Sequence, residues 1–224
     1  MIIWFFTLVY AAMMVVTALV MYRYTQKQYV ICKMITATLF LVIALLAYNR
    51  APMEIFFYLM PGFCFCWGGD LFLALAHEID NKLRNPQFII GVISFTIGQI
   101  IIAFALLTAL GWHISWTIII PFIVLGYTIC CTKSKDYEFG INAIPCSIYG
   151  FFVGLSAALG LQLILQNPGS TPALFLGIGT ILFLISDAVL SMKLFWKKDV
   201  PWSGAGVIAF YFGAMWFLTS AICM

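Results

Sequence analysis

Three fully charged side chains, Lys33, Asp70 and Asp187, interrupt the long apolar stretches of this 224-residue chain. A charge at the centre of a helix in lipid costs about 3 kcal/mol on insertion scales, so such residues are expected to pair or to line a polar cavity. One ammonium group can neutralise one carboxylate, which leaves the second carboxyl group either protonated or hydrated. Two carboxyl groups in unequal environments are what acid and base catalysis uses.

The composition predicts that almost the whole chain lies in a membrane. Hydrophobic residues make up 64% of it and charged residues only 8%, a balance that a water-soluble protein could not bury. A spanning helix needs about 20 apolar residues. We therefore expect an all-α membrane protein, a bundle of eight transmembrane helices in a single integral membrane domain over residues 1–224. The expected spans are Ile2 to Met21, Tyr29 to Tyr48, Ile55 to Ala76, Gln87 to Leu110, His113 to Cys131, Ile141 to Leu165, Pro172 to Met192, and Trp202 to Cys223.

The basic residues in the joints between these stretches predict an orientation. Alternate joints hold nine lysine and arginine residues, whereas the opposite side holds only Arg50. By the positive-inside rule the nine are cytoplasmic, which places both termini outside. Because the basic residues are scattered, the net charge of +3 does not indicate nucleic-acid binding. The nine are Arg23, Lys27, Lys82, Arg84, Lys133, Lys135, Lys193, Lys197 and Lys198.

This orientation places the three intramembrane charges at one depth. At a rise of 1.5 Å per residue, Lys33 lies roughly 6 Å past the inner boundary, and Asp70 and Asp187 lie roughly 8 to 9 Å deep. Since the three residues are on different helices, we expect one polar pocket that opens toward the cytoplasmic leaflet. Gln99 adds an amide deeper in the membrane, about 18 Å from the inner end of its helix.

The two aspartates share a short local pattern. The segments "GGDLFL", residues 68–73, and "ISDAVL", residues 185–190, each contain a small residue, Asp, two residues and Leu. Their helices run in the same direction and are four apart in order. This is the arrangement expected of two four-helix halves related by a parallel repeat.

Other reactive residue types suggest no site. Cys64 and Cys66 are two residues apart on an expected helix, so they point in different directions, and no further ligands complete a metal site. His77 and His113 lie near span ends, where an interfacial role is expected because no catalytic partner accompanies them. The sequence lacks a Gly-x-Ser-x-Gly elbow, a Walker loop and a His-Glu-x-x-His motif. We expect neither a metal nor a cofactor.

Taken together, the motifs resemble the lysoplasmalogenase, or YhhN, family of eight-helix membrane hydrolases. The matching segments are Lys33 early in the second span, "GGDLFLAL" around Asp70, "FIIGVISF" from Phe88 to Phe95, "LFLISDAVLSMKLF" around Asp187, and "AFYF" with Tyr211. The chain departs from the family pattern at three positions. Gln99 and Ile102 stand where the family usually has His and Tyr, and Met215 stands where it usually has Gln.

The resemblance implies hydrolysis of the vinyl ether bond of a lysoplasmalogen, an alkenyl glycerophosphocholine or glycerophosphoethanolamine, to a fatty aldehyde and a glycerophospho head group. Asp70 and Asp187 would be catalytic: one protonates the vinyl ether, and the other stabilises the resulting oxocarbenium-like cation. Lys33, Gln99 and Tyr211 would bind the lysophospholipid substrate. The expected location is the bacterial cytoplasmic membrane, and nucleic acid is not an expected partner.

Two other readings use the same buried charges. A proton-coupled transporter, or a lipid-binding protein without enzymatic activity, could carry intramembrane carboxylates of this kind. A pocket that faces only the inner leaflet beneath a closed outer side favours the hydrolase. On a purely structural reading, Lys33 and the aspartates only offset each other's burial, and apolar residues could replace them together.

Overall fold

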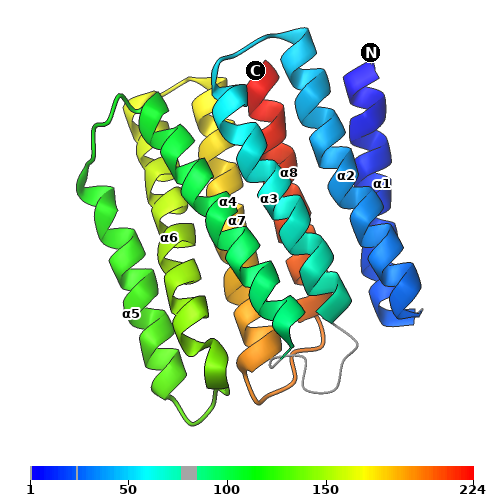
Figure 1. The fold of residues 1–224 in the computed structure, drawn as a ribbon. Helices are drawn as coiled ribbons and strands as arrows, with labels where there is room; N and C mark the ends of the chain where they lie inside the picture. The colour runs from blue at the N-terminus through cyan, green and yellow to red at the C-terminus, as the bar shows by residue number, and fades with distance from the viewer. Residues whose placement is uncertain (1, 24, 77–84) are drawn as a thin grey trace.

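Long helices packed side by side make up the computed structural model, which describes residues 2–23, 25–76 and 85–224 (Figure 1). Eight of the described helices are long and apolar enough to cross a membrane, which confirms the expected all-α bundle. They are α1 (Ile2–Arg23), α2 (Gln26–Arg50), α3 (Ile55–Ala76), α4 (Pro86–Ala109), α5 (Ile119–Lys133), α6 (Ala143–Gln166), α7 (Thr171–Phe195) and α8 (Ser203–Ser220). Three short 3-10 turns, η2 (Trp116–Ile118), η3 (Gly140–Asn142) and η4 (Ala221–Cys223), extend α5 and α6 at their beginnings and α8 at its end.

The fifth span begins later than the sequence suggested. His113 was the expected first residue, but Gly111 and Trp112 have φ angles of 59° and 64°, and the spanning segment starts only at Trp116. The side chain of Gln162 on α6 supports the intervening loop. Its Nε2 donates to the carbonyl of His113 at 2.7 Å, and its Oε1 accepts from the amide of Ser115 at 3.0 Å. Backbone groups that leave the helical pattern are thereby satisfied inside the protein, as a membrane environment requires.

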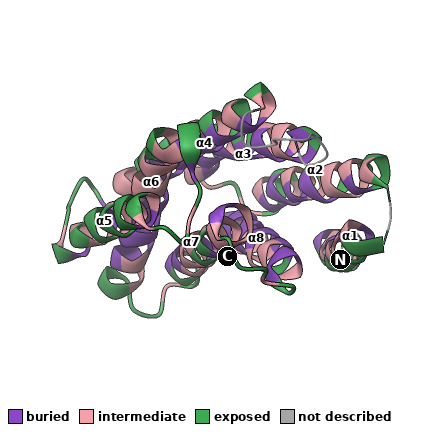
Figure 2. Cartoon of the chain, turned by 90° about the horizontal axis from the view of Figure 1, so that it is seen from below, coloured by how far each residue is buried: buried purple, intermediate pink, exposed green. Residues whose placement is uncertain are grey.

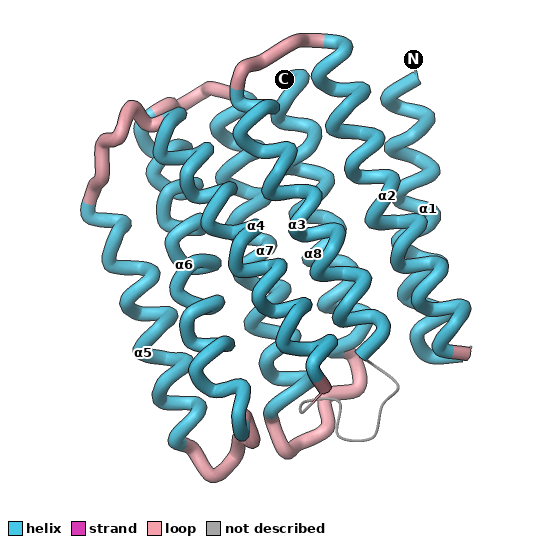
Figure 3. Tube along the Cα trace, viewed as in Figure 1, coloured by secondary structure: helices cyan, strands magenta, loops and turns pink. Residues whose placement is uncertain are grey.

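Successive helices alternate in direction, so both termini lie at one end of the bundle (Figure 3). The joints α1–α2, α5–α6 and α7–α8, which hold most of the nine basic residues, lie together at the opposite end. Lys82 and Arg84, as well as His77, lie outside the described residues. We refer to the end with the basic joints as the inner end and to the end with the termini as the outer end.

Viewed from the inner end, α2, α3, α4 and α6 follow one another in a curved row, and α7 and α8 lie against its concave side (Figure 2). α5 and α1 occupy the two ends of this arrangement, where α5 packs along α6, and α1 packs along α2 and α8. These two helices bury the smallest share of their residues. Large apolar side chains such as Leu8 and Ile144 are more than 70% exposed, as expected of residues that face lipid.

Glycine residues allow several of these helices to approach closely. Gly150 and Gly154 have the spacing of a small-residue face, and α5 packs closely on it: a Cβ on Gly154 would lie 2.9 Å from the Cα of Pro121. The α6–α7 contact depends on a second pair. A Cβ on Gly177 would lie 2.6 Å from the carbonyl oxygen of Gly160, a separation that a real side chain could not adopt without moving one helix.

This close approach makes a stability prediction possible. Replacing Gly177 by Ala forces α6 and α7 apart, and overpacking of this kind typically costs about 1–3 kcal/mol. We expect Gly177→Ala to lower the thermal unfolding temperature of the detergent-solubilised protein. Gly213→Ala is the matched control, because a Cβ at Gly213 of α8 would meet nothing within 4 Å. Equal unfolding temperatures for the two variants would contradict this account of the α6–α7 interface.

Candidate active site

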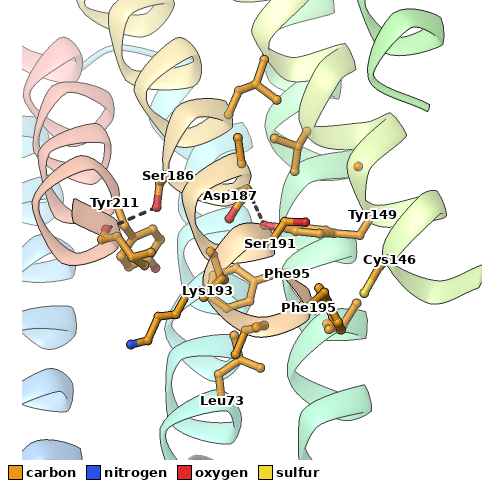
Figure 4. A pocket seen from close by; sticks show the side chains of 18 of the residues that line it. Leu73, Phe95, Cys146, Tyr149, Ser186, Asp187, Ser191, Lys193, Phe195 and Tyr211 are labelled. Carbon is orange, nitrogen blue, oxygen red and sulfur yellow. Dashed lines mark hydrogen bonds between the residues drawn. The ribbon is translucent and has the colours of Figure 1, made fainter. Parts of the chain in front are cut away.

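A cavity of about 450 Å³ lies in the inner half of the bundle, and all eight helices contribute to its wall. Its lining reaches the inner end of several helices, at Phe88 on α4, Phe195 on α7 and Gly204 on α8. Most of the lining is apolar. The charged and hydroxyl-bearing side chains of the lining are Tyr29, Lys33, Asp70, Tyr127, Thr128, Tyr149, Ser186, Asp187, Ser191, Lys193 and Tyr211. Figure 4 labels several of them.

The first carboxyl group of the cavity belongs to Asp70, which forms an ion pair with Lys33. The Nζ of Lys33 lies 3.0 Å from Oδ1 of Asp70, and the side chain of Asp70 is only 1% exposed. Tyr211 on α8 donates from its hydroxyl to Oδ2 of the same carboxylate at 2.6 Å. Both carboxylate oxygens are therefore satisfied, one by an ammonium group from α2 and the other by a phenol from α8.

The glycines before Asp70 allow α4 to pack closely against α3. A Cβ on Gly69 would lie 2.5 Å from the ring of Phe95, so only glycine leaves room for that ring. A Cβ on Gly68 would lie 3.2 Å from Oγ of Ser94, whose hydroxyl donates to the carbonyl of Phe65 at 2.6 Å. The "GGD" motif thus combines the carboxyl group with a close contact between α3 and α4, and the ring of Phe95 in that contact also lines the cavity.

The second carboxyl group, that of Asp187, has different surroundings. Tyr149 on α6 donates from its hydroxyl to Oδ2 of Asp187 at 2.6 Å (Figure 4). Among the described residues, the structure gives Asp187 no ion pair of the kind that Lys33 forms with Asp70. Asp187 is also less deeply buried than Asp70. The two carboxyl groups of the cavity therefore differ in both their partners and their access to its interior.

A group of aromatic rings connects the two centres. The ring of Phe95 lies 5.9 Å from that of Tyr211 and 6.3 Å from that of Tyr149, measured between centroids. Phe183 packs against both Phe95 and Tyr211, at 6.3 Å and 5.3 Å. The two tyrosines that bind the carboxyl groups are thus held by one aromatic cluster. Because the faces of such rings carry negative partial charge, this wall also suits a cation formed in the cavity.

Four of the five residues expected at the site come together here. Lys33, Asp70, Asp187 and Tyr211 all line the cavity, whereas Gln99 does not. Gln99 lies one turn farther toward the outer end of α4 than Phe95 and is 1% exposed, and its carbonyl accepts from Ser156 Oγ at 3.2 Å. The other two positions that depart from the family pattern, Ile102 and Met215, are fully buried and likewise absent from the lining.

Tyr149 is the residue that sequence reasoning missed. Tyrosine is common in this chain, with ten residues, and a single hydroxyl group leaves no mark on a hydropathy profile. A signal existed in the spacing of the two Asp motifs. Lys33 precedes Asp70 by 37 residues, and Tyr149 precedes Asp187 by 38. The spacing of 37 residues, counted back from Asp187, leads to Gly150, which directly follows Tyr149.

Between the cavity and the outer end, the bundle is densely packed. Large side chains there are less than 2% exposed, and they come from α2, α3, α4 and α8. They include Phe40, Leu59, Phe63, Ile102, Leu106, Met215 and Leu218. In the described part of the chain, no cavity lining residue belongs to the outer ends of these helices. The cavity is therefore a pocket of the inner half and not a passage across the bundle.

The described residues contain no group of three or more His, Cys, Asp and Glu side chains that could hold a metal ion. Cys64 is exposed and Cys66 is buried, so the two thiols face different environments, as their spacing indicated. The two carboxyl groups, with the ammonium group of Lys33, the phenols of Tyr149 and Tyr211 and the aromatic rings beside them, are the chemical groups of the two centres.

Comparison with models of known protein families identifies the family of this chain. Searches of the curated proteins and of the solved structures found no match, but the model of the YhhN family matches residues 28–222, which include every polar residue of the two centres. The match covers most of the chain, and the chain therefore belongs to the YhhN family.

Proposed function

We propose that this membrane protein is a hydrolase of the lysoplasmalogenase type, which cleaves the vinyl ether bond of a lysoplasmalogen to a fatty aldehyde and a glycerophospho head group. The YhhN family includes lysoplasmalogenases. The observation that carries the proposal is the inequality of the two carboxyl groups in one largely apolar cavity: Asp70 has an ammonium partner, whereas Asp187 has a hydroxyl partner.

This inequality supports a division of roles. A charge in an apolar wall is costly without a counter-ion, so a carboxyl group that lacks one favours its neutral acid form. Asp187 is accordingly the proton donor of the proposed reaction. Asp70, paired with Lys33 at 3.0 Å, is the permanent carboxylate, and it stabilises positive charge that forms in the cavity.

The proposed reaction consumes one water molecule. The proton of Asp187 forms a C–H bond with the outer vinyl carbon, and the positive charge is then shared by the inner vinyl carbon and the ether oxygen. Water adds to that carbon and returns a proton to Asp187, which yields a hemiacetal. The hemiacetal then releases the aldehyde, as its hydroxyl proton is transferred to the departing glycerol oxygen. Charge development resembles that in glycoside hydrolysis, where two carboxyl groups also divide these tasks.

A transporter is the main alternative, and the packing of the bundle argues against it. Transport needs a path that opens to each side of the membrane in turn. Here the large buried side chains of the outer half, including Phe63 and Met215, close the bundle on the side of the termini. A cavity limited to the inner half suits an enzyme that takes its substrate from one leaflet.

Loss of either carboxyl group provides the direct test. General acid catalysis typically contributes 10²–10⁴-fold in rate, so we expect Asp187→Asn and Asp70→Asn each to lower aldehyde release from choline or ethanolamine lysoplasmalogen by about that factor or more. Asp199→Asn, at an exposed position between α7 and α8, is the matched control and should keep full activity. Purified protein in detergent and an aldehyde assay suffice. Unchanged turnover in both site variants would rule out the carboxyl mechanism.

A double variant separates catalysis from simple charge balance. Lys33→Met leaves the buried carboxylate of Asp70 unpaired, and breaking a buried pair in this way costs about 3–5 kcal/mol. Adding Asp70→Asn removes that charge, so we expect the double variant to recover thermal stability in detergent but not aldehyde release. Recovery of both would mean that the pair is structural only, and recovery of neither would contradict the charge-balance explanation of stability.

The proposed cellular setting is the bacterial cytoplasmic membrane, with the cavity on the cytoplasmic side and both termini outside. The support is the positive-inside rule, applied to the basic residues at the inner end. Alkaline phosphatase fused after Met224 should then be active, because it folds only outside the cytoplasm. Green fluorescent protein fused at the same place should be dark, because it does not become fluorescent when it is exported unfolded. The reverse result would place the cavity in the other leaflet.

A further inference from the structure

The cavity has a mouth between α5 and α7. Ile123 and Tyr127 on α5 line the cavity, yet they are 61% and 57% exposed. Ala188 on α7 also lines it and is exposed. A residue that both lines a cavity and faces the outside marks an opening, so the cavity reaches the lipid-facing surface at this point.

The packing of the helices explains why the bundle is open there. α5 packs along α6 through Gly150 and Gly154, while α7 packs on the other side against α6 and α8. α6 packs against both α5 and α7 and lies between them (Figure 2). The part of the cavity that these three helices line forms a groove, with α6 at its back. Gly150 lines the cavity at this place and leaves space because it has no side chain.

The inner end of this groove is closed. Phe139, which follows α5, stacks on Phe195 at the end of α7 with ring centroids 4.0 Å apart. Two backbone hydrogen bonds fix the same connection: the amide of Glu138 donates to the carbonyl of Phe195 at 2.8 Å, and the amide of Lys197 donates to that of Asp136 at 2.9 Å. Access through the mouth is therefore sideways, from the membrane interior, and not along the helices from the aqueous phase.

We infer that the single hydrocarbon chain of a lysophospholipid enters and lies in the mouth between α5 and α7, with its head-group end directed toward Asp187. This rests on the proposed function and specifies how its substrate binds. The side chains at the mouth are mainly apolar, among them Ile123, Val124, Leu184 and Ala188. They face the depth at which lipid contains only hydrocarbon, and the groove is continuous with Tyr149 and Asp187.

The size of the cavity agrees with this placement. A volume of about 450 Å³ is in the lower half of the 300–1,000 Å³ range of pockets that enclose a drug-sized ligand. A lysophospholipid with a long chain is larger than such a ligand, so part of its chain must extend through the opening into the surrounding lipid. Chain length would then affect binding mainly through contacts at the mouth.

Blocking the mouth tests the inference. Ala188→Trp places a large ring at the opening, and we expect it to lower kcat/KM for long-chain lysoplasmalogen by about tenfold or more, while a water-soluble short-chain vinyl ether with the same head group retains its turnover. Ile185→Trp is the matched control. Ile185 is 39% exposed on the same helix, three residues before Ala188, but does not line the cavity.

The outcomes distinguish the two proposals. If the unmodified protein releases aldehyde from neither substrate, the proposed function fails. If it is active and Ala188→Trp lowers turnover of both substrates equally, or of neither, the chain does not use this mouth and the inference is overturned.

A second measurement does not depend on catalysis. A photoreactive p-benzoylphenylalanine at Tyr127 should cross-link a labelled alkyl lysophospholipid in detergent, and excess unlabelled lipid should suppress the product. Ile129, which is 39% exposed on α5 and absent from the cavity lining, serves as the control position. There, cross-linking should be weak and insensitive to competitor. Equal and non-saturable labelling at both positions would overturn the inference.

Discussion

The ion pair between Lys33 and Asp70 is the constraint on which the rest of the site depends. Either charge alone would be strongly unfavourable inside an apolar bundle, so α2 and α3 must meet where the two side chains can touch. Asp70 also needs a partner for its second oxygen, which Tyr211 supplies from α8 at 2.6 Å. One buried charge pair therefore determines how three helices are placed relative to each other, and the cavity lies beside it.

The second half of the chain holds a similar set of residues at nearly the same spacing, with one chemical difference. Tyr149, Asp187 and Tyr211 follow Lys33, Asp70 and Phe95 by 116, 117 and 116 residues. The residues of each set lie on corresponding helices, as expected of two four-helix halves related by a parallel repeat. At the position where the first half has the ammonium group of Lys33, the second half has the phenol of Tyr149. The first half thus holds an ion-paired carboxylate, and the second half holds a carboxyl group bonded to a hydroxyl.

The sequence predicted the depth of the site in the bundle better than it predicted which residues line the cavity. A fixed rise per residue placed Lys33, Asp70 and Asp187 at one level, and the structure brings all three to one cavity. Depth does not determine where a pocket ends, however, and Gln99 lies one turn beyond the lining in the packed outer half. The sequence did not point to Tyr149, because a tyrosine within a membrane span has only a small energetic penalty and does not stand out as a buried charge does. The fifth span begins later than predicted because the backbone turns at Gly111 and Trp112, and a hydropathy profile does not detect such turns.

The asymmetry of the bundle across the membrane fits the physical demands of the proposed reaction. Hydrolysis of a lysophospholipid requires both water and a hydrocarbon chain at one point, and it yields an apolar aldehyde together with a polar head group. The lining contains Asp187 beside Ala188, so the proposed proton donor is adjacent in sequence to the mouth. The same cavity extends to Lys193 and Gly204 at the inner end of the bundle. The aldehyde can then leave sideways into the membrane and the head group toward water, while the packed outer half keeps protons and solutes from crossing.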